Sequence, residues 1–254
     1  MYTDTEGVVL KQVKTLNGRR MIVLLTRKFG KISAGTSISE SGKSKSSLAI
    51  RPFTFGRYEI NKTRGAYHIN GAETLESYYR IGGDVDKFMN CAYVLEFTDK
   101  LVPEEAPAEP VLTLLCAYFA LMERRPKKFD VLTLAYLLKV LQMWGLAPET
   151  GRCARCGAEA ADAAWFSARE GGIVCKQCSG AENIENLNDD ALIYPLNFGI
   201  VNVMKYLMEH TLSDLENLAL DASASGLLLR IVRGHISCHL DIGPLKSESL
   251  SFNF

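Results

Sequence analysis

Two pairs of cysteines carry the clearest chemical signal in this sequence. Cys153 and Cys156 are separated by two residues, Cys175 and Cys178 repeat this spacing, and 18 residues lie between the pairs. A C-x2-C turn presents two thiolates to one ion, and two such turns supply the four ligands of a tetrahedral zinc site. Because four thiolates leave no position open for water, we predict one structural Zn2+ rather than a catalytic metal. Two disulfides or four free thiols are the alternatives.

The first 80 residues are strongly basic. They contain 14 Lys+Arg against 6 Asp+Glu, a balance of +8, whereas residues 81–254 contain 15 against 23, a balance of −8. A basic groove on a small barrel can follow a phosphate backbone, so this half could bind a polyanion. A scattered, solvated basic surface is the alternative. The residues that we expect to contact such a polyanion are Lys11, Arg19, Arg27, Lys28, Lys31, Lys43, Lys45, Arg51 and Arg57.

No catalytic motif accompanies these patterns. The sequence has no GxGxxG after a strand pattern, no GxxxxGK[ST], no GxSxG and no HExxH. His235 and His239 have the H-x3-H spacing of a helical metal site, with Cys238 between them, but a pair on the surface of a helix is the favoured interpretation. We therefore predict that the protein is not an enzyme.

The basic half has the pattern of a β-barrel. Residues 5–80 contain short β-branched and aromatic runs, and Asn17-Gly18 is typical of a hairpin turn. Four or five short antiparallel strands hide their edges best in a closed barrel of the OB type. The seven serines of Ser33–Ser47 indicate a long loop, and strand character resumes over Leu48–Ile60. Within that strand, Phe53 and Phe55 would share one face.

The acidic half has helical spacing. Asp84 is a plausible N-cap for the first of three helices within residues 84–146. A further helix follows Asn188, with an interruption at Pro195, and the last one covers Asp221–Leu240.

These patterns predict an α+β protein of two domains. We expect an N-terminal OB-fold barrel over residues 1–80 and an α-helical domain over residues 81–254, with a four-cysteine zinc ribbon inserted at residues 151–180. The start of the sequence lacks the basic n-region of a signal peptide, and no apolar run is long enough to span a bilayer. The expected location is therefore the cytoplasm.

With this order of modules, several phrases of the sequence resemble the bacterial RecO recombination-mediator family. The most specific is Phe166-Ser-Ala-Arg-Glu-Gly-Gly-Ile-Val-Cys-Lys-Gln-Cys178, preceded by Trp144-Gly-Leu-Ala-Pro-Glu149 and Arg152-Cys-Ala-Arg-Cys-Gly157. Members of the family have the pattern GLxPxLxxCxxCG followed by FxxxxGGxxCxxC at similar spacing. Looser similarities are Leu24-Leu25-Thr26 to Phe29-Gly30-Lys31, Arg51-Pro52-Phe53, Tyr93-Val94-Leu95-Glu96 and Leu245-Lys-Ser to Ser251-Phe252.

The resemblance implies a non-enzymatic role in recombinational DNA repair. Such proteins bind single- and double-stranded DNA, anneal complementary strands, act with RecR and help to load RecA. They work on strands coated by single-stranded-DNA-binding protein, whose acidic, Phe-ended tail docks on the helical domain. A cytoplasmic, nucleoid-associated location follows. A tail of that kind needs a basic pocket, for which the candidates in this sequence are Arg124, Arg125, Lys127, Lys128 and Lys205.

The sequence departs from the family pattern in one loop. Relatives usually carry an arginine-rich loop before the LQPF-like phrase, but Thr36–Ser47 is serine-rich, with Glu40 and only Lys43 and Lys45 as cations. Each missing phosphate contact lowers the affinity for DNA and its salt dependence. We therefore expect weaker DNA binding by this chain alone. A zinc-stabilised protein-interaction scaffold with little intrinsic DNA binding is the alternative function.

Overall fold

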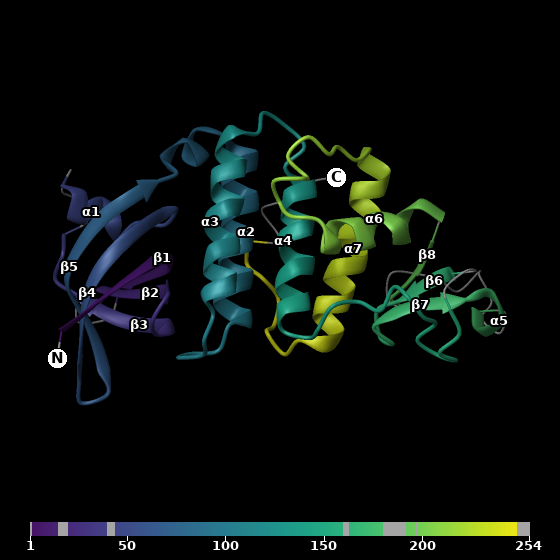
Figure 1. Cartoon of the computed structure of the whole chain (residues 1–254), viewed down its shortest axis with the longest axis horizontal. Helices are drawn as coiled ribbons and strands as arrows, with labels where there is room; N and C mark the ends of the chain where they lie inside the picture. The colour runs from purple at the N-terminus through teal and green to yellow at the C-terminus, as the bar shows by residue number, and fades with distance from the viewer. Residues whose placement is uncertain are drawn as a thin grey trace. The chain divides into compact units, whose positions relative to one another are not determined.

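The computed structural model describes residues 2–14, 20–39, 44–159, 163–179, 192–196 and 198–247 (Figure 1). These residues form two compact units. The first contains the described residues up to Arg125 together with Leu245–Ser247, and the second contains the described residues from Pro126 to Pro244. The predicted Asn17-Gly18 turn and the helix start at Asn188 lie outside the described residues.

A five-stranded closed barrel begins the first unit. Its strands follow the order β1-β2-β3-β5-β4, the arrangement of an OB-type barrel, which confirms the predicted fold class. The pairings are antiparallel except β3 with β5, whose parallel register sets Ala34 opposite Tyr67. The strand bounds are β1 Tyr2–Lys14, β2 Arg20–Thr26, β3 Gly30–Thr36, β4 Thr54–Thr63 and β5 Ala66–Ser77.

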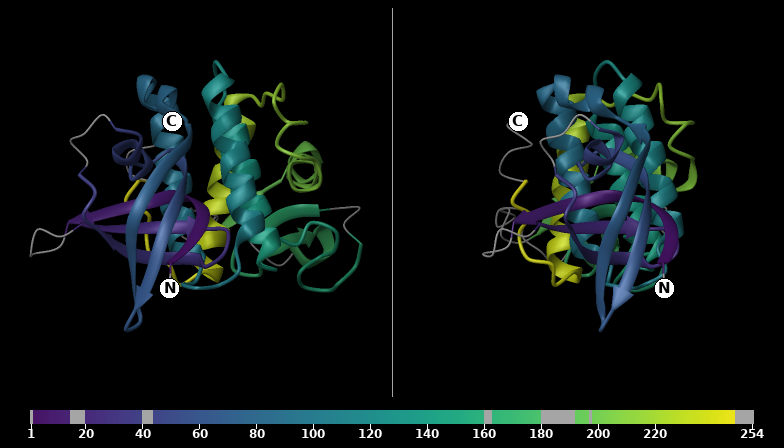
Figure 2. Two further views of the ribbon diagram at one scale, coloured as in Figure 1. Left: turned by 60° about the vertical axis from the view of Figure 1, so that its left-hand side comes forward. Right: turned by 90° about the vertical axis from the view of Figure 1, so that its left-hand side faces the viewer.

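The interior of the barrel follows from the alternation of apolar residues along its strands. In β3, burial alternates along the strand, so Ile32 and Ala34 face inward. These side chains meet Ile22, Leu24 and Ile60 in one core that excludes water. The right-hand view in Figure 2 looks at the barrel strands.

The predicted loop is wrong at both of its ends. Ser33–Ser47 was expected to be a loop followed by a strand from Leu48, but residues 33–36 belong to β3 and Lys45–Ala49 forms the short helix α1. Ser44 caps this helix, because its side chain accepts a hydrogen bond from the Ser47 N–H. The buried Tyr58 hydroxyl then donates to the Ala49 carbonyl oxygen at 2.6 Å and fastens α1 to β4.

Phe53 also departs from its predicted place. It precedes β4 with a φ of 60°, so it does not share a strand face with Phe55. Its ring packs instead against Phe88 and Phe119, with centroid distances of 5.6 and 5.5 Å. The aromatic side chain therefore joins the barrel to the helices of the same unit.

Two long helices complete the first unit. After the 3-10 turn η1 (Tyr79–Gly83), α2 covers Val85–Leu101 and α3 covers Glu109–Arg124. The predicted N-cap is confirmed, since the Asp84 carboxylate accepts a hydrogen bond from the Lys87 N–H at 3.0 Å. Both helices pack against β1.

The second unit combines helices with a small ribbon. Three helices pack on one another: α4 Asp130–Met143, α6 Phe198–Glu209 and α7 Ala222–His239. The ribbon is a sheet of order β7-β6-β8, and its elements are β6 Ala163–Ser167, β7 Gly172–Cys175, α5 Lys176–Ser179 and β8 Ile193–Pro195. Pro195 therefore ends a strand, and the prediction that it interrupts a helix is wrong. Within the described residues, no helix is long and apolar enough to cross a membrane.

Candidate metal centre and nucleic-acid interface

The ribbon brings the four paired cysteines together. All four are free, and their sulfurs lie within 4.8 Å of one another. The sulfurs of Cys156 and Cys175 are 3.8 Å apart. A tetrahedral site with Zn–S distances of about 2.3 Å places its sulfurs about 3.8 Å apart, so these donors fit one metal ion.

Local backbone geometry forms the two turns that carry these sulfurs. Gly157, at φ +73°, follows the first pair, and its N–H donates to the Cys153 carbonyl oxygen at 2.9 Å. Gly171, at φ +75°, lies in the turn between β6 and β7, which leads into the second pair. Both positions use the left-handed region that glycine adopts without strain. Arg155 crosslinks the two turns by donating to the Glu170 carboxylate at 2.8 Å and to the Cys178 carbonyl oxygen at 2.9 Å.

The protonation of the thiols indicates why the cluster favours a cation. Burial raises the pKa of Cys153, but hydrogen bonds from the backbone N–H groups of Cys175, Cys156 and Arg155 outweigh it and lower that pKa to about 6. Hydrogen bonds with the sulfurs of Cys156 and Cys175 raise the pKa of Cys178 to about 12. One thiolate therefore forms readily, whereas ionising all four sulfurs calls for a positive ion at their centre.

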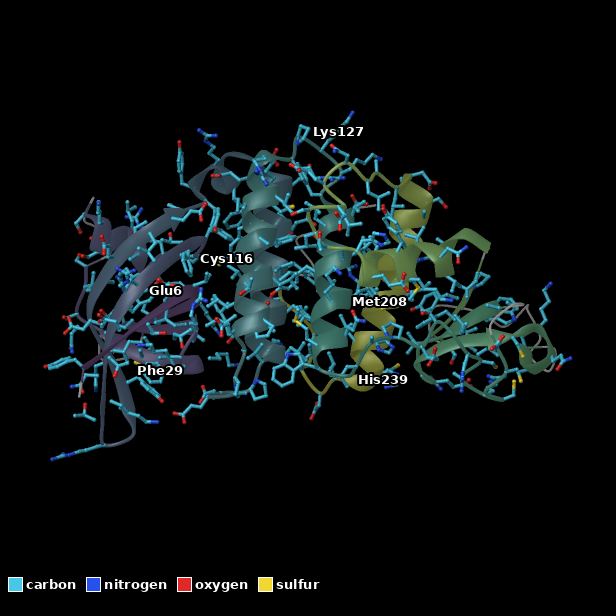
Figure 3. The ribbon with its side chains drawn as sticks, viewed as in Figure 1. Glu6, Phe29, Cys116, Lys127, Met208 and His239 are labelled. Atoms are coloured by element: carbon cyan, nitrogen blue, oxygen red, sulfur yellow. The ribbon has the colours of Figure 1, made fainter. Side chains whose placement is uncertain are left out.

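The prediction of a surface pair on α7 holds for His239, which is exposed, but is wrong for His235. His235 is only 3 % exposed, and its Nε2–H donates to the Leu146 carbonyl oxygen at 2.8 Å. The Nε2–H of His239 donates to the Ala168 carbonyl oxygen at 2.7 Å, beside the ribbon in Figure 3. The two rings lie 4.5 Å apart. They hold the ribbon and its preceding loop to α7, while Cys238 is exposed.

Acidic side chains compensate four of the predicted DNA contacts. Lys11 and Lys31 lie 3.9 and 3.7 Å from the Asp99 carboxylate. The Lys31 ammonium also donates to the Asp99 carbonyl oxygen, and its side chain is only 12 % exposed. Arg27 pairs with Glu6 at 3.4 Å and with Glu109 at 2.7 Å, and Arg57 shares Glu6 at 3.4 Å. Figure 3 labels Glu6 on the barrel.

The other predicted contacts lie in turns and short elements of the first unit or outside the described residues. Lys28 is exposed in the turn between β2 and β3, and Lys45 is exposed at the start of α1. Arg51 is half-buried between α1 and β4. Arg19 and Lys43 lie outside the described residues.

The barrel has a groove whose position and lining residues were not predicted from the sequence. Its volume is about 790 Å³, and it lies where β2, β3 and β5 meet. The side chains that line it include Arg20, Met21, Ser33, Ser37, Tyr67 and His68. Strands β2 and β3 of OB barrels form the usual surface for oligonucleotides. The local pattern gave no signal for this groove because it depends on the parallel pairing of β3 with β5, more than 30 residues apart.

The candidates for tail docking fall in both units. Arg124 ends α3 and is exposed, whereas Arg125 is 5 % exposed and so presents little surface to a partner. Lys127 and Lys128 are exposed before α4, and Lys205 is half-buried on α6. The structure tests none of them as a binding residue, so their role stays a prediction.

A closed OB barrel with a groove, followed by helices and a ribbon whose four cysteines could hold a metal ion, defines a class of proteins built from these three modules. Comparison with known families agrees with this class. The family model described as Recombination protein O N terminal matches residues 1–78, and Recombination protein O C terminal matches residues 82–249. The chain therefore belongs to the RecO family.

Curated relatives cover almost the whole chain. A protein named DNA repair protein RecO from Alkaliphilus metalliredigens is 27% identical over 241 residues, which are 95% of each chain. Its namesake from Desulforudis audaxviator is 28% identical over 254 residues, 98% of this chain and 95% of the relative. That from Acetivibrio thermocellus is 22% identical over 247 residues, 97% and 95% of the two chains.

Proposed function

We propose that this protein is a non-enzymatic DNA-binding mediator of recombinational repair, which binds single-stranded DNA and anneals complementary strands. The observation that carries the proposal is the groove across β2, β3 and β5, on a barrel whose sequence has an excess of eight positive charges. The relatives named DNA repair protein RecO support the same process.

The groove has the chemistry that a single strand needs. Arg20 supplies a cation, Ser33 and Ser37 supply hydroxyl groups, and the exposed His68 ring offers a face for base stacking. Lys28 and Lys45 add exposed charge on the same barrel. Two DNA strands repel each other, so a cationic surface that neutralises both raises the rate at which they pair.

We propose that the four cysteines hold one structural Zn2+. The ion would replace the charge repulsion among the thiolates with four metal–sulfur bonds. The ribbon sheet has only short strands, and its cluster of buried residues is small, with Cys153, Val174 and Cys175 as its members. The metal is therefore expected to supply much of the folding free energy of the ribbon.

The remaining roles are also proposals. Residues 1–80 would be the DNA-binding domain, although the compact unit of the structure extends to Arg125. RecR, RecA and the tail of single-stranded-DNA-binding protein would be the partners, in the bacterial cytoplasm at the nucleoid. Arg124, Lys127, Lys128 and Lys205 remain the proposed contacts of that tail, whereas the burial of Arg125 argues against a contact there.

Annealing of two complementary oligonucleotides tests the proposed function. We expect Arg20→Ser/Lys28→Ser/Lys45→Ser to lose most of the annealing rate, because one cation that lines the groove and two exposed cations of the same unit are gone. The control Arg169→Ser/Lys176→Ser/Arg230→Ser removes three exposed cations of the second unit and should anneal as the wild type does. Equal rates for both variants would refute the role of the groove.

A salt titration of single-strand binding tests the expectation that this protein alone binds DNA weakly. The serine-rich loop predicts fewer phosphate contacts, so a slope that implies about eight or more contacts would contradict it. A wild type that binds no DNA at any salt concentration would instead favour the protein-interaction scaffold.

A further inference from the structure

The segment between α2 and α3 carries a short acidic sequence onto the barrel. This acidic strap, residues 103–109, contains Glu104, Glu105 and Glu109. Its backbone is fixed to β3, since Glu104 bridges to Lys31 and the Glu105 N–H donates to the Lys31 carbonyl oxygen at 2.8 Å. In Figure 1 it is the connection that joins the helices α2 and α3.

The strap lies in close contact with the barrel. A side chain at Gly30 would overlap the Ala106 carbonyl oxygen, so the glycine permits this approach. Glu105 has a φ of 58°, a left-handed conformation that a glutamate rarely adopts. The surrounding contacts therefore hold the strap in one defined position.

Each carboxylate of the strap contacts a polar side chain of the barrel. Glu109 accepts from Arg27 at 2.7 Å, and Glu105 accepts from the Lys62 ammonium at 2.8 Å. Glu104 accepts from the Ser33 hydroxyl at 3.4 Å. The hydrogen bond with Glu105 raises the pKa of Lys62, and the same bond lowers the pKa of Glu105, so the pair stays charged at neutral pH.

Two of these contacts, those of Glu104 and Glu105, reach the edge of the groove. Ser33 lines it directly. The Lys62 ammonium donates to the hydroxyl of Tyr67, another lining residue, at 2.8 Å and lies 4.4 Å from the centre of its ring. The strap thus places negative charge next to the surface that we propose for DNA, on groups that would otherwise attract phosphates.

We propose that the acidic strap is an intrinsic competitor of DNA: its carboxylates occupy Arg27, Lys62 and Ser33, and a bound strand must exchange them for phosphate oxygens. This inference rests on the proposed function and adds a regulatory element to the same site. When the exchange occurs, the released glutamates take up cations from solution, so the net release of counterions is smaller than the number of phosphate contacts. Affinity and salt dependence are therefore both reduced by the strap.

Binding of a labelled single strand by Glu105→Gln/Glu109→Gln tests the proposal. We expect about 3- to 10-fold tighter binding at 0.1 M salt, from the loss of two exposed ion pairs. The slope of log K against log salt should steepen by up to about 1.4, since each of the two released cations adds about 0.7 on a single strand. The control Glu59→Gln/Glu73→Gln makes the same change in net charge at two exposed carboxylates of β4 and β5. Equal gains in the two variants would overturn the proposal.

A second pair of variants separates competition from a change in folding. Arg27→Ser/Lys62→Ser should alter wild-type binding little, because the phosphate contacts of these two cations are gained only at the expense of their contacts with the strap. The same substitutions in the Glu105→Gln/Glu109→Gln background should abolish the gain. Additive effects in the two backgrounds would contradict competition. If neither the wild type nor the glutamine variant binds DNA, the proposed function itself fails.

Discussion

At the scale of single residues, hydrogen bonds made by buried polar groups decide where short elements attach. Tyr58 is fully buried, and its hydroxyl reaches the last residue of α1, Ala49. Burial also raises the pKa of this hydroxyl, so it remains a donor at any physiological pH. The sequence marks Tyr58 as a strand residue but gives no sign of its partner.

Tyr58→Phe is therefore expected to lower the free energy of unfolding. The substitution keeps the ring and leaves the buried Ala49 carbonyl oxygen without this donor, which costs about 1–2 kcal/mol. Chemical denaturation monitored by circular dichroism measures the change. Tyr2→Phe alters a hydroxyl on a residue that is 64% exposed and should stay within about 0.5 kcal/mol of the wild type. Equal stability of the two variants would refute the structural role of the Tyr58 hydroxyl.

His235 makes the stability of the second unit depend on pH. Burial lowers its pKa, and the neighbouring His239 acts in the same direction. The unfolded chain, with an ordinary histidine pKa of about 6.5, then binds more protons than the folded chain at mildly acidic pH. The stability from neutral His235 is therefore complete above about pH 6.5 and is lost as the pH falls below that value.

We expect His235→Gln to flatten this dependence. The glutamine amide can still donate to the Leu146 carbonyl oxygen but does not titrate. Melting temperatures between pH 5 and pH 8 should fall less steeply on acidification than those of the wild type. His68→Gln, at an exposed position of β5, should retain the wild-type slope. If His235→Gln also retains the wild-type slope, the buried imidazole of His235 does not cause the pH dependence of the melting temperature.

At the scale of elements, the cap of α2 shows what local sequence can specify. Asp84 has extended backbone dihedrals, and its carboxylate accepts the Lys87 N–H, as the sequence predicted. We expect Asp84→Ala to cost about 1 kcal/mol of stability, because this N–H loses its partner. Asp84→Ser keeps an acceptor and should restore most of the loss in denaturation experiments. Similar losses in both variants would argue against capping.

Local signals predicted the elements whose ends depend on nearby residues. Asp84, for example, acts on an N–H three positions along the chain. Serine is ambiguous because it favours both loops and helix N-caps, and this explains why α1 was missed. The ion pair between Arg27 and Glu109 joins residues 82 positions apart, so no local pattern could reveal it.

At the scale of the whole molecule, charge is less segregated than the sequence halves suggest. The net charge of the chain is zero, and residues 1–80 have an excess of eight positive charges. The first unit extends to Arg125, however, and residues 1–125 contain 18 Lys+Arg against 14 Asp+Glu, a balance of +4. Half of the excess is therefore compensated within that unit, partly by Asp99 and the acidic strap.

If the four cysteines hold a metal ion as proposed, its removal should affect the two units differently. Cys153, Cys156, Cys175 and Cys178 all belong to the second unit, whereas the core of the barrel consists of residues of the first. A chelator should therefore expose the ribbon at residues 151–179 to proteolysis and hydrogen exchange, because metal binding and ribbon folding are coupled. The barrel strands should remain protected.

Cys156→Ser/Cys178→Ser provides the matching variant, since it removes two ligands without a chelator, and Cys238→Ser is the control for the loss of an exposed thiol. Elemental analysis should find about one zinc per wild-type chain and per Cys238→Ser chain, and much less in the double variant. Hydrogen exchange should then be faster in β6 and β7 of the double variant but unchanged in β1 to β5. Absence of zinc from the wild-type protein, or equal exchange in the ribbon with and without metal, would show that the four thiols do not fold the ribbon through a metal ion.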